Sequence, residues 1–296
     1  MDSRLNAFLE RADVVLARLE PLLPAPREPV DWTQALAARW VREGRNGYLM
    51  PLQVSLDMRL SDLIGVDLQR DQLGRNTRQF IDGLPANHAL LWGSRGTGKS
   101  SLIRALLAEY AQSGLRLVEI ERDHLADLPR LVEQLQALPQ RFVLFCDDLS
   151  FESGEGDYRV LKSVLDGSLE QAPDNVLLYA TSNRRHLVPE KESDNANWQQ
   201  VDGELHPSEA VEDKIALSDR FGLWLSFYPF TQDHYLNVVE HWIGQLALKS
   251  GLDWQRDEHL DKAAVRWATG RGNRNGRCAY QFARYWVGLQ LLEQHT

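Results

Sequence analysis

The sequence predicts an α/β fold in which a parallel β-sheet is flanked by helices, with helical regions at both ends of the chain. Two observations carry this prediction. Between about residues 63 and 225, short apolar segments alternate with amphipathic segments of helical periodicity, an order typical of parallel strands joined by crossover helices. Residues 231–296 keep the helical periodicity but contain no strand-like segment, which indicates a separate helical domain.

Four short apolar segments are the expected strands of this sheet. Their ranges are His88–Trp92, Leu115–Ile120, Phe142–Cys146 and Val176–Thr181. The third is apolar at every position, as in strands that are buried on both faces. The expected helices between them cover Ser100–Gln112, Leu128–Leu138 and, capped by Asp157, Tyr158–Glu170. Residues 189–213 form a polar, acidic insertion, which we expect to be a surface loop.

The first 62 residues are expected to be helical and separate from the sheet. Apolar residues between Phe8 and Leu19 recur at helical spacing, and the proline-rich stretch 21–29 ends that helix. A second helix is expected over about Asp31–Arg42, with Asp31 as its N-cap. The predicted organisation is therefore an N-terminal helical region (1–62), an α/β core (63–228) and a C-terminal helical lid (229–296).

Composition excludes several classes of function. The 296 residues carry a net charge of −9, so a protein-wide basic field for nucleic acid is absent, although a local patch is not excluded. No apolar run reaches the roughly 18 residues that a membrane helix needs, and the N-terminus lacks the apolar centre of a secretory signal. Two cysteines are too few for a disulfide framework or a zinc site. We therefore expect a cytoplasmic protein without membrane contact.

Residues 93–100 (GSRGTGKS) have the glycine, lysine and hydroxyl spacing of a phosphate-binding loop. A strand is expected before the motif and a helix after it, so that backbone amides and the helix N-terminus face an anion. This context argues against a chance match in a glycine-rich turn. We expect Lys99 to reach the β- and γ-phosphates of ATP and Ser100 to ligate magnesium. The expected binding residues are Gly93, Ser94, Arg95, Gly96, Thr97, Gly98, Lys99, Ser100 and Ser101.

Polar side chains follow the third and fourth expected strands. Asp147 and Asp148 end the third strand, where we assign Asp147 to magnesium and Asp148 to activation of the attacking water. Glu152 is a weaker candidate for the base, and capping of the strand end is the alternative for the acidic pair. If the fourth strand lies between the strand that precedes the phosphate-binding loop and the strand that Asp147 follows, Asn183 points at the γ-phosphate and can hold the water. An asparagine in an ordinary turn is the alternative for that position.

Two arginines are candidates for contacts with the nucleotide. Arg220 lies between apolar stretches in residues 217–227 and is assigned to the γ-phosphate of a neighbouring subunit. A surface salt bridge with Asp213 or Asp219 is its alternative. Arg277, at the start of an expected helix, is assigned to the nucleotide of its own chain. Arg271 and Arg274 are alternatives for this role, and a basic loop or a phosphate contact with nucleic acid is the competing interpretation.

With these elements in order, about residues 60–290 resemble the AAA+ ATPases. In that resemblance, residues 93–100 correspond to Walker A and residues 142–148 (FVLFCDD) to Walker B. Asn183 corresponds to sensor 1, Arg220 to the arginine finger and Arg277 to sensor 2. The sequence is more similar still to the bacterial family catalogued as domain of unknown function 815, a group of predicted AAA+ ATPases. The segments that carry this similarity are DDLSFE (147–152), ATSNRRHLVPE (180–190) and LSDRFGLWLSF (217–227).

The resemblance implies a homo-oligomer, a ring or an open assembly, with ATP at the subunit interfaces and an unknown protein client. One departure bears on the rate of hydrolysis, because many AAA+ proteins end Walker B with Asp-Glu and this chain has Asp147-Asp148. An Asp-Asp pair resembles that of bacterial replication initiators and helicase loaders, which use ATP more as a switch. A slowly hydrolysing loader or adaptor is therefore the second hypothesis. Nucleic acid as its partner is possible but is not indicated by the charge, and a small-molecule kinase is disfavoured.

Overall fold

The computed structural model describes residues 2–19, 28–44, 46–149, 160–162, 165, 173–183, 199–201, 204–206 and 220–294. The chain forms two compact units, Met1–Asp31 and Trp32–Thr296. The first contains helix α1 (Asp2–Leu19), which confirms the first expected helix, and its apolar side chains Leu5, Phe8 and Leu9 are exposed. Among the described helices, none is long and apolar enough to span a membrane.

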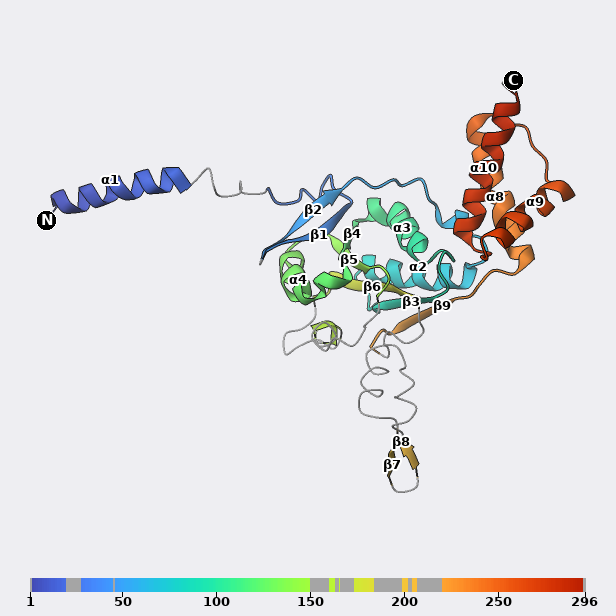
Figure 1. The fold of residues 1–296 in the computed structure, drawn as a ribbon. Coiled ribbons are helices and arrows are strands. Elements are labelled where there is room, and N and C mark those ends of the chain that lie inside the picture. The colour runs from blue at the N-terminus through green and yellow to red at the C-terminus, as the bar shows by residue number, and fades with distance from the viewer. Residues whose placement is uncertain are drawn as a thin grey trace. The chain divides into compact units, whose positions relative to one another are not determined.

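The second unit is built on a seven-stranded sheet with the order β2-β1-β4-β5-β6-β3-β9 (Figure 1). All neighbouring strands are parallel except β1 and β2, which form an antiparallel hairpin at one edge. A separate pair of short antiparallel strands, β7 and β8, lies within the expected acidic insertion. The strands are β1 (Ala37–Glu43), β2 (Asn46–Leu52), β3 (Ala89–Gly93), β4 (Leu115–Glu119), β5 (Arg141–Cys146), β6 (Val176–Ser182), β7 (Gln199–Val201), β8 (Glu204–His206) and β9 (Leu223–Phe227).

The helix expected over Asp31–Arg42 is wrong, because most of this segment is strand β1. Trp40 is only 1% exposed, and its indole nitrogen donates to the Asp127 carboxylate at 3.1 Å. Gly44, with φ of 60°, makes the turn into β2, where a Cβ on Gly47 would overlap the Trp40 ring. Pairing with β4 and burial of this one indole therefore override the local helical preference of the segment. The domain boundaries after residues 62 and 228 stay predictions.

Helices flank the sheet as expected, and the four expected strands are confirmed as β3, β4, β5 and β6. Helices α3 (Lys99–Tyr110) and α4 (Leu128–Gln136) confirm two of the three expected crossover helices. The third, expected over Tyr158–Glu170, lies mostly outside the described residues. Sequence analysis missed α2 (Asp67–Ile81) and β9. Short 3-10 helices, η2 (Leu60–Asp62), η3 (Ala111–Ser113) and η4 (Arg122–Asp127), connect these elements.

A buried polar network attaches α2 to the middle of the sheet. The Tyr179 hydroxyl in β6 accepts a hydrogen bond from Asn76 Nδ2 at 3.0 Å and lies 2.9 Å from the Thr77 hydroxyl. Asn76 also accepts a hydrogen bond from the backbone of Asn87, just before β3, at 2.9 Å. The network therefore fixes α2 against β3 and β6, the two strands that enter the candidate site.

The C-terminal helices form a bundle with its own core, and this confirms the expected helical lid. They are α8 (Gln232–Ser250), α9 (Glu258–Gly270) and α10 (Gly276–Gln294). Side chains of Thr231 and Asp257 cap α8 and α9 through the amides of His234 and Leu260. Tryptophan rings pack edge-on within the bundle, in the pairs Trp242–Tyr280, Trp254–Trp286 and Trp267–Phe282.

Candidate nucleotide-binding site

The expected phosphate-binding loop connects β3 to α3 and depends on its glycines. Gly93, Gly96 and Gly98 all have positive φ, at 129°, 76° and 106°, which only glycine adopts without strain. A Cβ on Gly93 would lie 2.0 Å from the carbonyl oxygen of Phe227 in β9. The Thr97 hydroxyl donates to the Ser94 carbonyl at 2.8 Å and closes the turn. The loop therefore forms because β9 approaches the end of β3 closely and no side chain intervenes.

Lys99 holds its ammonium group inside this loop. Its Nζ donates to the carbonyl oxygens of Gly93 and Ser94 at 2.6 and 2.7 Å and lies 3.5 Å from Asn183 Oδ1. Burial lowers the pKa of Lys99 to about 8, against the opposing influence of the carboxylates of Asp147 and Asp148. The cation is thus destabilised where it lies, and a phosphate placed beside it would restore its charge.

Asp147 ends β5 and joins two hydroxyl groups from neighbouring elements. Its Oδ1 accepts a hydrogen bond from Ser100 Oγ at 2.7 Å and one from Thr181 Oγ1 at 2.5 Å. These are hard oxygen donors, the chemistry that Mg²⁺ prefers, and the ion commonly takes only one or two ligands from protein with phosphates and waters completing its shell. Among the described residues, no group of three or more His, Cys, Asp or Glu side chains forms a metal cage. The residues present therefore fit a magnesium ion that arrives with a nucleotide.

Asp148 adopts a strained backbone conformation and is contacted from two sides. Its φ is 55°, the single positive value among the described non-glycine residues. Its amide donates to Thr181 Oγ1 at 2.9 Å, and its Oδ1 accepts a hydrogen bond from Asn183 Nδ2. Arg95, in the phosphate-binding loop, approaches Asp148 Oδ2 at 3.5 Å. Strand β6 lies between β5 and β3, as the expectation for Asn183 required, and it brings this amide beside both Asp148 and Lys99.

The lid meets the loop at the start of α10. The Arg277 amide donates to the Gly96 carbonyl at 3.3 Å, and Asn275 Nδ2 donates to the Arg95 carbonyl at 3.0 Å. Asn275 Oδ1 also accepts a hydrogen bond from Cys278 N at 2.8 Å, and so caps α10. One side chain therefore both begins the lid helix and attaches it to the phosphate-binding loop.

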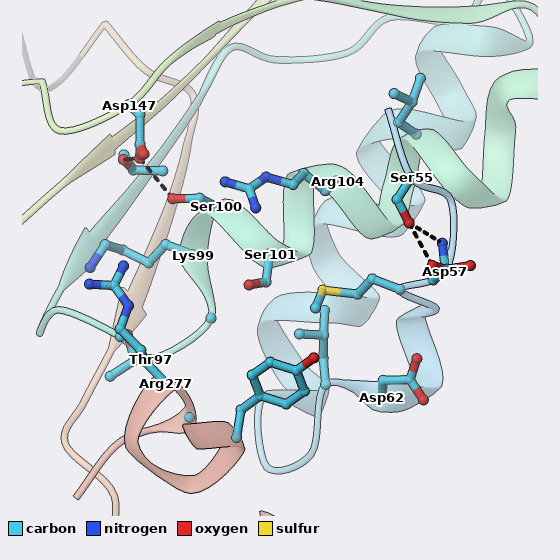
Figure 2. A pocket seen from close by; sticks show the side chains of 18 of the residues that line it. Ser55, Asp57, Asp62, Thr97, Lys99, Ser100, Ser101, Arg104, Asp147 and Arg277 are labelled. Atoms are coloured by element: carbon cyan, nitrogen blue, oxygen red, sulfur yellow. Dashed lines mark hydrogen bonds between the residues drawn. The ribbon is translucent and has the colours of Figure 1, made fainter. Parts of the chain in front are cut away.

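A cavity of about 1020 Å³ joins these groups. Figure 2 shows Lys99, Ser100 and Asp147 along it, with Arg277 beside Thr97 of the loop and Asp62 farther along the same cavity. The alternatives to Arg277 are placed differently, because the Arg271 guanidinium stacks 3.5 Å from the centre of the Trp267 ring and neither Arg271 nor Arg274 lines the cavity. Buried apolar side chains line its wall beside the loop, namely Leu63, Val66, Phe230 and Val238.

Arg220 lies away from this cavity. It precedes β9, whose first residue, Leu223, pairs with Ala89 at the start of β3. The phosphate-binding loop follows the other end of the same pair of strands, where Phe227 pairs with Gly93. Arg220 thus lies at the amino ends of these strands, whereas the loop follows their carboxyl ends. The fold does not bring Arg220 to the loop of its own chain. Three other residues weighed from the sequence, Glu152, Asp213 and Asp219, lie outside the described residues.

Two residues of the site, Thr181 and Asn275, were not expected from the sequence. Thr181 binds both Asp147 and the amide of Asp148, and Asn275 joins the lid to the loop. The sequence offered one signal for each of them. Thr181 is a hydroxyl residue at the end of a buried strand, and Asn275 is an asparagine before a helix, which is a preferred N-cap. Their partners lie 34 and 180 residues away in the chain, and only the fold shows such contacts.

Comparisons with known proteins identify a family and a fold for this chain. A family model described as Protein of unknown function (DUF815) matches residues 33–290, whereas a search of curated proteins finds no match. An alanine-to-serine mutant of Thermotoga maritima RuvB is similar with a TM-score of 0.50 and 16% identity, over 77% of this chain and 64% of that one. The Aeropyrum pernix ORC1 protein, solved in complex with DNA, is similar with a TM-score of 0.52 and 16% identity, over 80% and 65%.

The chain spans slightly less than two thirds of the length of each of these two structures. At such identity the likeness shows the fold, and it confirms the α/β architecture that the resemblance to AAA+ ATPases implied. The family model covers most of the chain. The protein therefore belongs to the family described as Protein of unknown function (DUF815), and its fold is that of the AAA+ ATPases.

Proposed function

We propose that the protein binds Mg-ATP in the cavity beside the phosphate-binding loop and hydrolyses it. The observation that carries this proposal is the convergence of Lys99, Ser100, Asp147, Asp148 and Asn183 from the ends of two parallel strands, β5 and β6, and from the N-terminus of helix α3. Such groups at the carboxyl ends of parallel strands are suited to a triphosphate with a hard cation. The apolar wall formed by Leu63, Val66 and Phe230 offers a surface for the nucleotide base.

Each polar side chain has a role in this proposal. Lys99 exchanges the two loop carbonyls for β- and γ-phosphate oxygens, which restores the charge that burial disfavours. Ser100 and Asp147 hold magnesium, which neutralises phosphate charge when it is bound. Asn183 orients a water molecule toward the γ-phosphate, and Asp148 accepts its proton as the new oxygen–phosphorus bond forms. The bond between the γ-phosphorus and the oxygen that bridges to the β-phosphate breaks in the same displacement, and ADP leaves with that oxygen. Arg277 contacts the phosphates from the lid.

The proposal also assigns a role to Arg220 in an oligomer. Arg220 lies at the amino ends of the strands, and the loop of its own chain follows their carboxyl ends. A contact between Arg220 and a γ-phosphate therefore requires a second copy of the chain. An arginine supplied in this way typically raises turnover by roughly 10³- to 10⁵-fold. The hydrolysis rate per subunit of the wild type should then rise with protein concentration, whereas the rate per subunit of Arg220→Ala should remain slow at every concentration. A rate that is independent of concentration and unaffected by Arg220→Ala would refute the role in trans.

Two substitutions test the binding site itself. Lys99→Ala should abolish tight ATP binding in calorimetry, because it removes the cation from the phosphate-binding loop. Asp147→Asn should retain nucleotide binding but lose magnesium-dependent hydrolysis. Unchanged ATP affinity in Lys99→Ala would refute the assignment of the loop, and an unchanged rate in Asp147→Asn would show that the metal lies elsewhere.

A second candidate function is an ATP switch that hydrolyses slowly and changes the affinity for a partner. The contacts of Asp148 favour it, because Asn183 and Arg95 each approach one of its two carboxylate oxygens. Such contacts occupy the carboxylate oxygens that would otherwise accept a proton from the attacking water. Single-turnover rates distinguish the two functions: a slow rate that a partner accelerates supports the switch, and fast turnover that is indifferent to any partner supports the continuous ATPase.

A further inference from the structure

The segment from Lys262 to Leu292, which covers most of α9 and α10, has a charge opposite to that of the whole chain. From Lys262 to Leu292 the sequence contains six basic residues and no acidic residue, in a chain whose net charge is −9. Five of the six are arginines, and all five are exposed. The bundle that carries them is drawn in orange to red in Figure 1. The five are Arg266, Arg271, Arg274, Arg277 and Arg284.

None of these five arginines has a carboxylate partner among the residues that the structure describes. In the rest of the second unit, arginines such as Arg39, Arg78 and Arg256 form ion pairs with Glu or Asp. On the lid, Arg271 and Arg284 instead contact the faces of aromatic rings, at 3.5 Å from the centre of Trp267 and 5.9 Å from that of Tyr280. A group of exposed arginines without carboxylate partners attracts an anionic partner.

Aromatic rings lie among these cations. Trp267 in α9 stacks on Tyr285 in α10, with ring centres 4.8 Å apart and an interplanar angle of 28°. Tyr285 is 51% exposed and Tyr280 is 38% exposed. On α10, Gln281, Arg284, Tyr285 and Gly288 follow one another at helical spacing on one exposed face. Stacked rings between arginines are suited to flat bases joined by phosphates, whereas an acidic peptide or a lipid headgroup presents no such planar groups.

We propose that the exposed face of α9 and α10, centred on Arg266, Arg271, Arg284 and Tyr285, binds single-stranded nucleic acid. Arginines contact backbone phosphates, and the Tyr285 ring, supported from behind by Trp267, stacks on a base. The net charge of the whole chain does not reveal this basic surface, because the cations are confined to one end of the sequence. The inference does not rest on ATP hydrolysis. It does supply a partner class for the switch, since Arg277 on the same helix lines the nucleotide cavity.

Gly288 permits a test that leaves the fold intact. It is exposed in the middle of α10, and a Cβ there would meet no atom within 4 Å. Gly288→Glu therefore adds one negative charge to the proposed surface, and Gly288→Ala is the matched neutral control. Both substitutions favour the helix relative to glycine. Tyr285→Ala and Tyr285→Phe form a second pair, in which only the first removes the ring.

The measurement is the anisotropy of a labelled single-stranded oligothymidine with the full chain, at two salt concentrations and without ATP. The wild type should bind, with affinity that falls steeply as salt rises. Gly288→Glu should weaken binding by roughly twofold to fivefold relative to Gly288→Ala. Tyr285→Ala should weaken it by about fivefold or more while Tyr285→Phe binds as the wild type does. All four variants should keep wild-type ATP affinity, which separates this site from the nucleotide cavity.

Three outcomes would overturn the proposal. The first is equal affinity of Gly288→Glu and Gly288→Ala. The second is equal displacement of the oligonucleotide by polyglutamate of matched charge, which would identify the surface as a site for acidic protein. The third is absence of binding at low salt. Each can occur while Lys99→Ala still abolishes ATP binding, so failure here and failure of the proposed ATPase function are distinguishable.

Discussion

The ionisation of Lys99 leads to a quantitative prediction for ATP binding. Burial lowers the pKa of this ammonium to about 8, from an ordinary value of 10.5. In the unliganded protein, about half of the Lys99 side chains are therefore charged at pH 8 and about one tenth at pH 9. Triphosphate oxygens within hydrogen-bond distance stabilise the charged form. ATP therefore binds the protonated side chain, and binding above pH 8 requires the uptake of a proton.

The expected magnitude follows from this single group. If only the protonated form binds, the apparent dissociation constant for Mg-ATP should rise about tenfold between pH 7 and pH 9. At pH 8, about half a proton should be taken up per ATP bound. Calorimetry at constant free magnesium measures both quantities, the second from the dependence of the observed enthalpy on the ionisation enthalpy of the buffer.

Lys99→Arg is the matched control, because a guanidinium remains charged throughout this range. Its affinity is expected to be weaker, since its planar fork differs from an ammonium group, but it should not change between pH 7 and pH 9. A wild-type affinity that stays flat over the same interval would refute the reasoning. In that event either Lys99 remains charged beside Asp147 and Asp148, or it does not contact the phosphates.

Three further predictions concern stability and the connection between lid and loop. His88 is buried, its pKa is lowered to about 4 by that burial, and it accepts a hydrogen bond from Leu178 N. The contribution of its neutral imidazole to the free energy of unfolding is present above pH 6.5 and is lost as the pH falls through 4. His88→Gln should therefore flatten the acid side of a stability–pH curve measured by urea unfolding, by about 3 kcal/mol at most. Trp40→Ala should cost about 3–5 kcal/mol in the same assay, because it empties a buried site between the hairpin and α4; a loss below about 1 kcal/mol would contradict the packing of β1. Asn275→Ala and Arg95→Ala should each change the hydrolysis rate, and a double-mutant cycle should give effects that are not additive; strict additivity would show that the two residues act independently.

The predictable part of the fold is the part that local patterns encode. Strand β5 is apolar at each central position, and its burial on both faces was predicted correctly. Strand β1 was mistaken for a helix because alanine, leucine and tryptophan recur at spacings that also suit a helix. What makes it a strand is pairing with β4 and burial of Trp40 beside Asp127, which lies 87 residues away. Tertiary contacts of that kind leave no local signal.

The candidate site divides in the same way. Lys99, Ser100 and Asp147 were predictable because phosphate binding requires fixed spacing or a fixed place at a strand end. The position of Asn183 could be stated only as a condition on strand order, and the order β5-β6-β3 meets it. Arg277 could not be separated from its neighbours by sequence, because spacing does not tell which arginine faces the cavity. The lining of the cavity makes that distinction, because it includes Arg277 but neither Arg271 nor Arg274.

Arg95 connects the separate parts of the site. Its carbonyl accepts the hydrogen bond of Asn275 from the lid, and its guanidinium lies 3.5 Å from Asp148 Oδ2. Both contacts belong to one residue of the phosphate-binding loop, so a displacement of α10 that breaks the first also frees the backbone that positions the second. A nucleotide whose phosphates attract the Arg95 side chain would withdraw it from Asp148 and leave that carboxylate oxygen open to the attacking water. Binding, lid position and the readiness of Asp148 are then linked through one residue, which gives a physical route by which an Asp-Asp pair can serve as a switch and still hydrolyse ATP.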